Sequence, residues 1–247
     1  MMDAAFFAAL LIAFVSGTVF GLVGFGFALV SVTPLLQFYD PPTVVALSIS
    51  LTIVNSILVV ASARDAVHHR TLLPMLPGAF VGLVVGARLL QALDSDAIKL
   101  MASCVVLLFT LALVARITLP GAHTKGAAVV IGTVSGLLAT STGLSGPPVV
   151  LLLTARKFAP HPFRVTTSAY FLCVNTVGFA ILVIQGTIGQ SQLSIVAALL
   201  PTALLGTITG RHLARYVSPA GFRHAIMLLL LLTSALGIAT TLPNYLA

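Results

Sequence analysis

The sequence predicts an all-α integral membrane protein with two inverted-topology repeats, each a broken, re-entrant helical hairpin followed by three transmembrane helices. Composition predicts the membrane setting: 59% of the residues are hydrophobic and 7% are charged, whereas soluble proteins carry about 25% charged residues. The mean hydropathy of +1.15 agrees. A duplicated motif predicts the repeats, and the distribution of Lys and Arg predicts their opposite orientation.

The first repeat is expected to cover residues 1–119. Its apolar run at 5–23 is long enough to cross about 30 Å of hydrocarbon, but the run at 27–38 is too short to span alone. Together they form the hairpin 5–38. Asp3 stands where a signal peptide would carry basic residues, so the segment is kept as structure. Spanning helices are then predicted at 43–62, 72–92 and 99–116.

The second repeat is expected to cover residues 120–247, with a junction near Pro120-Gly121. Its hairpin, 126–155, has a longer limb at 126–141 and a short limb at 146–155. The spanning helices that follow are predicted at 165–185, 193–212 and 224–242. The second repeat therefore has the same order of elements as the first.

The repeats are linked by matching sequence blocks. Gly17-Thr18-Val19-Phe20-Gly21 recurs as Gly132-Thr133-Val134-Ser135-Gly136, and Val54-Asn55-Ser56 matches Val174-Asn175-Thr176. The paired glycines in the first block are interpreted as small residues that let helices pack closely, not as a binding site. A Gly-rich break follows each copy of that block.

Basic residues gather in alternate inter-span segments, which places those segments on the cytoplasmic side. They are Arg64, Arg70, Arg116, Lys125, Arg156, Lys157, Arg164, Arg211, Arg215 and Arg223, against Arg88 and Lys99 elsewhere. Because the segments before and after 126–155 are both basic, this stretch enters and leaves on one side. The second repeat is then inverted and both termini are periplasmic. Alternatively, each broken segment is one long crossing, which would place Arg211, Arg215 and Arg223 outside.

The two hairpin tips are the main candidate substrate site. A break within lipid is tolerated only where the freed backbone groups face protein or a cavity, and the N-terminus of each short second limb attracts anions. Ser145 or Gly146 is expected to cap the second limb, with Pro147 at its start. The candidates are Gly24, Phe25, Gly26 and Phe27 in the first tip, and Gly143, Leu144, Ser145, Gly146 and Pro147 in the second.

Polar residues within the spans are further candidates. Asn55 and Asn175 occupy equivalent positions and need partners in lipid, which a ligand or an interhelical bond would supply. A second rank consists of Ser50, Thr52, Thr167, Ser168, Arg88 and Arg164. The hydroxyls in this set often bond to their own helix. Snorkelling also explains Arg88, and a topology signal also explains Arg164, which otherwise attracts anions on the cytoplasmic side.

Several function classes are disfavoured. The acidic residues are all Asp at segment ends or in loops, so a carboxylate proton relay or cation site within the spans is not expected. There is no P-loop motif, metal-ligand spacing or catalytic constellation, so no cofactor, metal or enzyme activity is predicted. The basic residues lie in short loops, so nucleic acid is not an expected partner. The expected partners are a small anion and membrane lipid, and the oligomeric state stays open.

Two motifs carry a family resemblance. Gly21-Leu22-Val23-Gly24-Phe25-Gly26 and Thr142-Gly143-Leu144-Ser145-Gly146-Pro147-Pro148-Val149-Val150 resemble the paired motifs of the sulfite exporter TauE/SafE family, also called the toluene sulfonate uptake permease family. The resemblance runs the length of the chain. It departs from the family's usual first motif at Phe27 and Ala28, which favours an organic sulfonate over bare sulfite.

The resemblance implies transport of sulfite, sulfoacetate or a related sulfonate across the bacterial inner membrane. Because the cell interior is negative, anion export gains about 2.3 kcal/mol per charge per 100 mV and requires no coupling ion. We expect export by alternating access of two inverted halves. A passive anion channel and an uptake permease for a sulfonate are the alternatives.

Overall fold

The computed structural model describes residues 4–115, 119, 121–213, 216 and 219–246, and these contain helices and no strand. The first part of the chain forms α1 (Ala4–Val23), α2 (Phe27–Leu35), α3 (Pro41–Ser62), α4 (His69–Leu72), α5 (Leu76–Ala92) and α6 (Ser95–Val114). Two short 3₁₀ turns, Arg64–Ala66 and Leu73–Met75, flank α4. The second part forms α7 (Lys125–Thr142), α8 (Gly146–Ala155), α9 (Pro160–Ile184), α10 (Gln190–Leu213) and α11 (Pro219–Leu246).

Helix length and composition place the protein in a membrane. Among the described residues, six helices are long and apolar enough to cross it: Ala5–Val23, Pro41–Ala61, His69–Ala92, Ser95–Val114, Pro160–Ile184 and Gln190–Leu213. The prediction of an all-α integral membrane protein is confirmed. Two helices expected to span fall outside this set. Helix α7 carries Ser, Thr and Gly along much of its length, and the part of α11 whose side chains are described is the apolar stretch Met227–Pro243.

Two helix pairs, each made of one helix from the first part of the chain and one from the second, pack the two parts together, and we call them the exchanged pairs. Helix α1 packs along α10, and α5 packs along α7. Both pairs approach closely at glycines, because a Cβ on Gly17 would overlap the carbonyl oxygen of Ala203, and one on Gly136 would overlap that of Ala79. The predicted packing role of these glycines is confirmed. Each pair therefore joins the first helix of one part of the chain to a later helix of the other part.

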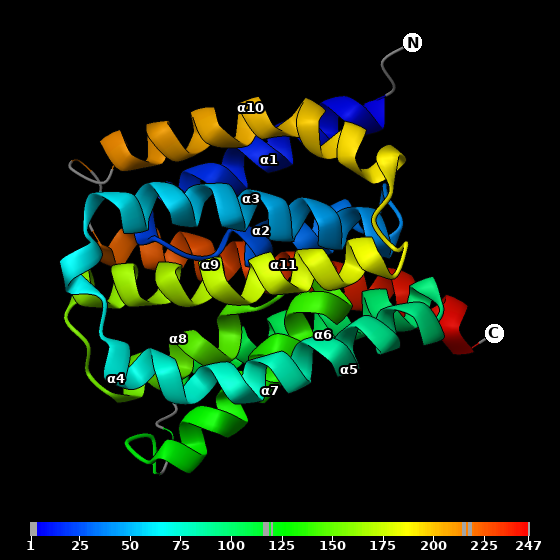
Figure 1. The fold of residues 1–247 in the computed structure, drawn as a ribbon. Coiled ribbons are helices and arrows are strands. Elements are labelled where there is room, and N and C mark those ends of the chain that lie inside the picture. Colours follow the sequence, from blue (N-terminus) through cyan, green and yellow to red (C-terminus); the bar gives the residue numbers. More distant parts are fainter. Residues whose placement is uncertain (1–3, 116–118, 120, 214–215, 217–218, 247) are drawn as a thin grey trace.

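Helices α3 and α9 pack against each other between the two exchanged pairs. Figure 1 shows α1 and α10 at one face of the bundle, α5 and α7 at the opposite face, and α3 and α9 between them. The middle helices carry buried residues on both sides, such as Leu47 and Ile49 in α3 and Val174 in α9. This central position places their polar residues away from lipid.

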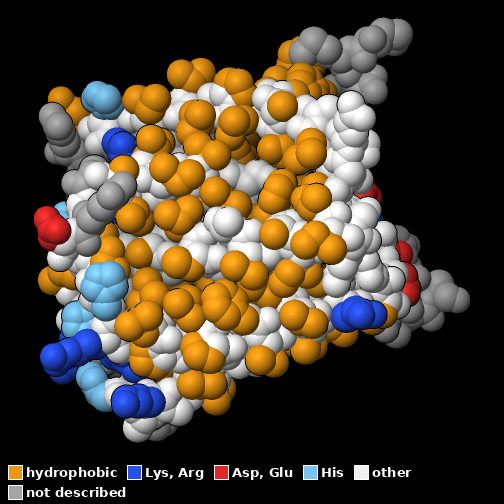
Figure 2. Space-filling view, in the orientation of Figure 1, with side chains coloured by type: hydrophobic (Ala, Val, Ile, Leu, Met, Phe, Trp, Pro, Cys, Tyr) orange, Lys and Arg blue, Asp and Glu red, His pale blue; other side chains and the backbone are white. Residues whose placement is uncertain are grey.

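Charged side chains divide between the two ends of the bundle. Figure 2 shows most Lys, Arg and His side chains at the end where α3 and α8 finish, which we call the basic end, and most Asp side chains at the other. The first residues of α1 and the last of α11 lie at the Asp-bearing end (Figure 1). Asp3, Arg116 and Arg215, and the side chains of Arg64 and Arg223, lie outside the described residues. The inverted order of the repeats remains a prediction.

Candidate functional site

The first hairpin tip is a glycine turn between α1 and α2. Gly24 has φ +87° and Gly26 has φ +96°, which is a backbone region that favours glycine. The N–H of Gly24 donates to the carbonyl oxygen of Phe20 (2.7 Å), which ends α1. Gly26 is the N-cap of α2. The turn therefore starts a new helix within the bundle without a side chain at either special position.

The second tip connects α7 to α8 and is held by hydroxyl groups. Gly143 has φ +78° and caps the C-terminus of α7, and Ser145 is the N-cap of α8. The Ser48 hydroxyl donates to the carbonyl oxygen of Gly143 (2.8 Å), and the Ser135 hydroxyl donates to that of Ser145 (2.6 Å). A proline stands in the first turn of α8. The predicted capping of this limb by Ser145 or Gly146 agrees with this geometry, although the Ser145 side chain makes no capping hydrogen bond.

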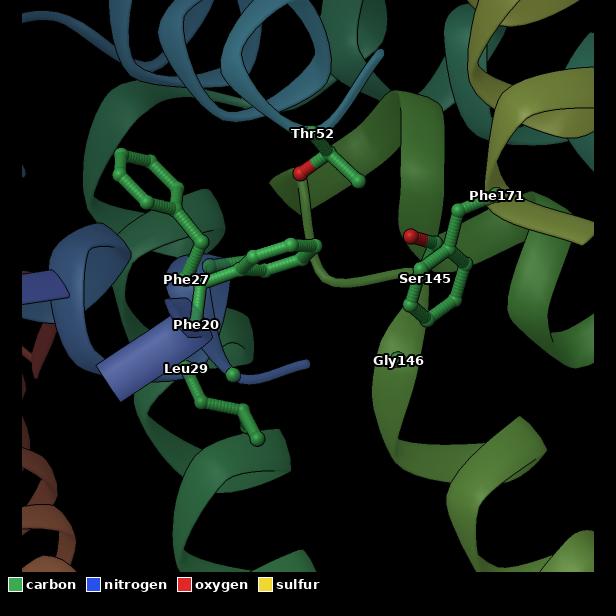
Figure 3. A pocket seen from close by; sticks show the side chains of 9 residues that line it. Phe20, Phe27, Leu29, Thr52, Ser145, Gly146 and Phe171 are labelled. Atoms are coloured by element: carbon green, nitrogen blue, oxygen red, sulfur yellow. The ribbon is translucent and has the colours of Figure 1, made fainter. Parts of the chain in front are cut away.

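A small pocket lies between the two tips. Figure 3 shows Phe20, Phe27 and Leu29 on one side, Ser145, Gly146 and Phe171 on the other, and Thr52 between them. Gly26 and Ala28 complete its lining. The cavity measures about 10 Å³, which is about the space for a single water molecule. The tips therefore converge on one site, and this conformation leaves no room there for a sulfonate.

Backbone N–H groups from two helix starts lie around the pocket, a chemistry that suits anions. Its lining residues Gly26 to Leu29 are the N-cap and first three residues of α2, and Ser145 and Gly146 are the N-cap and first residue of α8. These are the positions whose N–H groups have no intrahelical partner, and both helix dipoles point their positive ends at the cavity. Pro147 and Pro148 have no N–H, so α2 offers more donors than α8.

Aromatic side chains enclose these donors. Phe20 and Phe27 are each 1% exposed, and Phe171 is 3% exposed. Their rings exclude water, and hydrogen bonds to an anion are stronger in such a low-dielectric setting. The pocket is therefore suited to a ligand with an anionic head and a small apolar part. Thr52 adds a hydroxyl group to the wall.

The structure brings some of the predicted site residues together and separates others. Five of them line the pocket: Gly26, Phe27, Thr52, Ser145 and Gly146. The others lie outside the lining: Gly24, Phe25, Gly143, Leu144, Pro147, Asn55, Asn175, Ser50, Thr167, Ser168, Arg88 and Arg164. The lining thus consists largely of the starts of the two short helices, and the predicted turn residues before them only shape the tips.

The polar residues outside the lining differ in their hydrogen bonding. Asn55 Nδ2 donates to the carbonyl oxygen of Leu51 (2.9 Å), while Asn55 Oδ1 and Asn175 Nδ2 are buried without partners among the described residues. The buried hydroxyls of Ser50 and Ser168 also have none there. Thr167 instead bonds back to its own helix, donating to the carbonyl oxygen of Phe163 (2.7 Å). The two asparagines and two serines keep unused hydrogen-bonding capacity inside the bundle.

The two arginines in the predicted set lie in different places. Arg88 is exposed on α5 and does not line the pocket. Arg164 is half-buried, and a Cβ on Gly24 would overlap its side chain at Cγ and lie 2.9 Å from Cδ. Arg164 therefore lies directly against the backbone of the first tip.

Four lining residues were not predicted: Phe20, Ala28, Leu29 and Phe171. Phe20 lies inside the duplicated block, at the position that matches Ser135 in the second copy. Phe171 stands one helical turn before Asn175, so both lie on one face of α9. This spacing could have identified Phe171 from the sequence. Ala28 and Leu29 could be identified only once the start of α2 was known.

Comparisons with known proteins show the family to which the chain belongs. The family model for the sulfite exporter TauE/SafE matches residues 9–236. The chain is also similar to the probable sulfite/organosulfonate exporter TauE of Cupriavidus necator, with 26% identity over 215 residues, which cover 84% of each protein. No solved structure matches the chain. Because the family model covers most of the chain, this membrane protein belongs to the sulfite exporter TauE/SafE family.

Proposed function

We propose that this transporter exports a small sulfur-containing anion, such as sulfite, sulfoacetate or a related sulfonate, across the bacterial inner membrane. One observation carries the proposal: the starts of α2 and α8 face a shared pocket and supply N–H donors from two sides. The name of the Cupriavidus necator relative, a probable sulfite/organosulfonate exporter, points to the same class of anion. An oxyanion group fits this donor set because helix N-termini bind phosphate, sulfate and carboxylate groups in the same way.

Among the described residues, the absence of acids from the pocket lining supports an anionic cargo without a coupling cation. The described Asp residues lie at helix starts or in a loop turn: Asp40, Asp65, Asp94 and Asp96. None of them lines the pocket. A proton or sodium pathway normally needs a carboxylate within the membrane. The membrane potential alone is therefore proposed to drive export, by about 2.3 kcal/mol per charge per 100 mV.

The closed pocket favours alternating access over a passive channel. A cavity of about 10 Å³ must widen before a sulfonate can enter, and an open pore would not need this change. We propose that the α1–α10 pair and the α5–α7 pair move as two bodies on either side of α3 and α9. Their interlocked glycines make each pair a rigid unit, and each pair carries one hairpin tip. Relative motion of the pairs would open the tips to one side or the other.

The proposal is tested by efflux from proteoliposomes loaded with sulfite or sulfoacetate under an imposed potential. Efflux is expected to saturate, to accelerate when the lumen is negative and to be stimulated by substrate on the opposite side. Efflux that is indifferent to the potential would overturn the electrogenic mechanism. Non-saturable flux without counter-stimulation would favour the channel, and inward transport alone would favour uptake.

A matched pair of glycine variants tests the pocket itself. A Cβ on Gly146 would lie 3.6 Å from Phe171 Cζ, an ordinary contact, whereas one on Gly126 in α7 would meet nothing within 4 Å. Gly146→Ala is therefore expected to fold normally and to narrow the pocket. Overfilling a packed site costs about 1 to 3 kcal/mol, so its substrate affinity should fall about tenfold. Gly126→Ala should leave affinity unchanged, and equal affinity in both variants would contradict the site.

A further inference from the structure

Two arginines flank the end of α1 at the basic end. Arg164 lies in the first turns of α9, with its Nε 3.0 Å from the position that a Cβ on Gly24 would occupy. Arg211 lies in the last turn of α10, and its backbone nitrogen is 3.0 Å from the corresponding position at Gly21. Gly21 and Gly24 are a single helical turn apart. Both arginines therefore stand beside the same short stretch, immediately before the pocket.

Each of the two guanidinium groups has a donor that is unused in the described part of the chain. The Nε atoms of Arg164 and Arg211 are both buried without a hydrogen-bond partner among the described residues. The positive charges of Arg211 and Arg164 lie close enough to repel each other. Within the described part of the chain the ion pair is Lys99 with Asp96, so no described carboxylate neutralises either arginine at ion-pair distance. Two like charges that are partly removed from water require a counter-charge.

Arg156 provides a comparison within the same end of the molecule. It is also half-buried, yet its Nε donates to the carbonyl oxygen of Ala122 (2.6 Å). Its other nitrogens donate to Thr71 Oγ1 (3.0 Å) and to the carbonyl oxygen of Thr124 (3.3 Å). A structural arginine in this protein is thus satisfied by protein atoms. The unused donors of Arg164 and Arg211 point to a ligand that comes from outside the chain.

We propose that Arg164 and Arg211 form a second anion-binding site at the basic end, where a small oxyanion is held before it passes the first tip into the pocket. A guanidinium group presents N–H donors in a planar fork that matches two oxygens of an oxyanion. The identity of this oxyanion as sulfite or a sulfonate rests on the proposed function. The site formed by Arg164 and Arg211 lies beside Gly24, outside the pocket lining. Substitutions can therefore disable the two sites separately.

Binding of radiolabelled sulfite tests this site in a background where the pocket is filled by Gly146→Val. Purified protein in phosphatidylcholine nanodiscs is expected to retain one bound sulfite. Adding Arg211→Gln or Arg164→Gln should weaken that binding about tenfold or more, as expected for loss of a charge-assisted hydrogen bond. Arg211→Lys should recover part of it by restoring the charge. Arg70→Gln removes an exposed arginine at the same end and should change nothing.

Two outcomes would overturn the site. Unchanged sulfite binding in both glutamine variants, with monodisperse protein, shows that the arginines do not hold the anion. Retention of phosphatidylglycerol that depends on these arginines, with sulfite binding unaffected, assigns them to a lipid headgroup instead. Failure of the proposed function is distinct: the wild-type protein would then show no sulfite efflux, while arginine-dependent binding of sulfite would still support an oxyanion site.

Discussion

The two hairpin tips occupy matching places in the sequence but are held in different ways. The second tip is locked by two hydroxyl groups, Ser48 on Gly143 and Ser135 on Ser145. The first tip has Phe20 where the second has Ser135, and Ser168 where the second has Ser48. Ser168 Oγ has no partner in the described structure. Both tips thus present a helix N-terminus, but hydroxyl groups hold the second tip, while the first has a buried serine hydroxyl without a described partner beside it.

This contrast predicts different roles for the two tips in transport. We expect the second tip to keep its shape during transport, because its carbonyl groups are bonded and its short helix starts with prolines. The first tip contains two glycines with positive φ and the side chain of Arg164 beside it, so it can change conformation at low cost. It also offers more N–H donors to the pocket. We therefore expect the first tip to respond to the anion and the second to act as a fixed wall.

The largest effect is expected at the first tip. Gly24→Val places a branched side chain at φ +87°, where it also overlaps Arg164. The backbone strain alone is about 1 to 2 kcal/mol, so we expect efflux to be lost even where protein is recovered. The measurement is sulfite efflux normalised to reconstituted protein. Gly126→Val is the control, and equal activity in the two variants would show that the turn is not required.

A smaller effect is expected at the rigid tip. Ser48→Ala removes the hydroxyl that holds the Gly143 carbonyl oxygen, and a buried hydrogen bond contributes about 1 kcal/mol. The melting temperature, followed by fluorescence-detected size exclusion, should fall measurably. The matching variant, Ser168→Ala, removes a hydroxyl without a described partner and should leave the melting temperature nearly unchanged. If both variants lose the same stability, the two tips are not held differently.

The smallest effect is expected for the pocket wall. Thr52→Val replaces the hydroxyl with a methyl group of similar size at a site that is 6% exposed. The hydroxyl is one of several donors around the pocket, so losing its hydrogen bond to the anion should raise the KM of efflux a few-fold with little change in maximal rate. Saturation curves on reconstituted protein measure both quantities. An unchanged KM would remove Thr52 from the site.

Much of the architecture could be predicted from sequence, because apolar runs and glycine breaks are local signals. The predicted short limbs at 27–38 and 146–155 correspond to α2 and α8. The motif residues Gly26, Phe27, Ser145 and Gly146 line the pocket because they start those helices. Because these signals are local, they predict each tip without information on the helices that pack around it.

The rest depends on packing between distant segments, which composition and spacing do not encode. Nothing in the sequence places Arg164 against Gly24, or Ser48 against Gly143, because these pairs come from different helices. Phe171 enters the pocket from α9 for the same reason. Asn55 and Asn175 match in sequence and are predicted substrate ligands within the spans, yet they lie on α3 and α9 outside the pocket lining. Each still has a buried polar atom without a partner among the described residues, so both stay candidates to contact the anion at another step of transport.

The most direct test of the central claim is a crystal structure with selenite, an oxyanion with the shape and charge type of sulfite whose selenium scatters anomalously. We predict an anomalous peak between the two helix starts, within hydrogen-bond distance of the N–H groups of Gly26 to Leu29 and beside Gly146. A second peak at Arg164 would agree with the second anion-binding site at the basic end. Bound selenite with no peak between α2 and α8 would contradict the account.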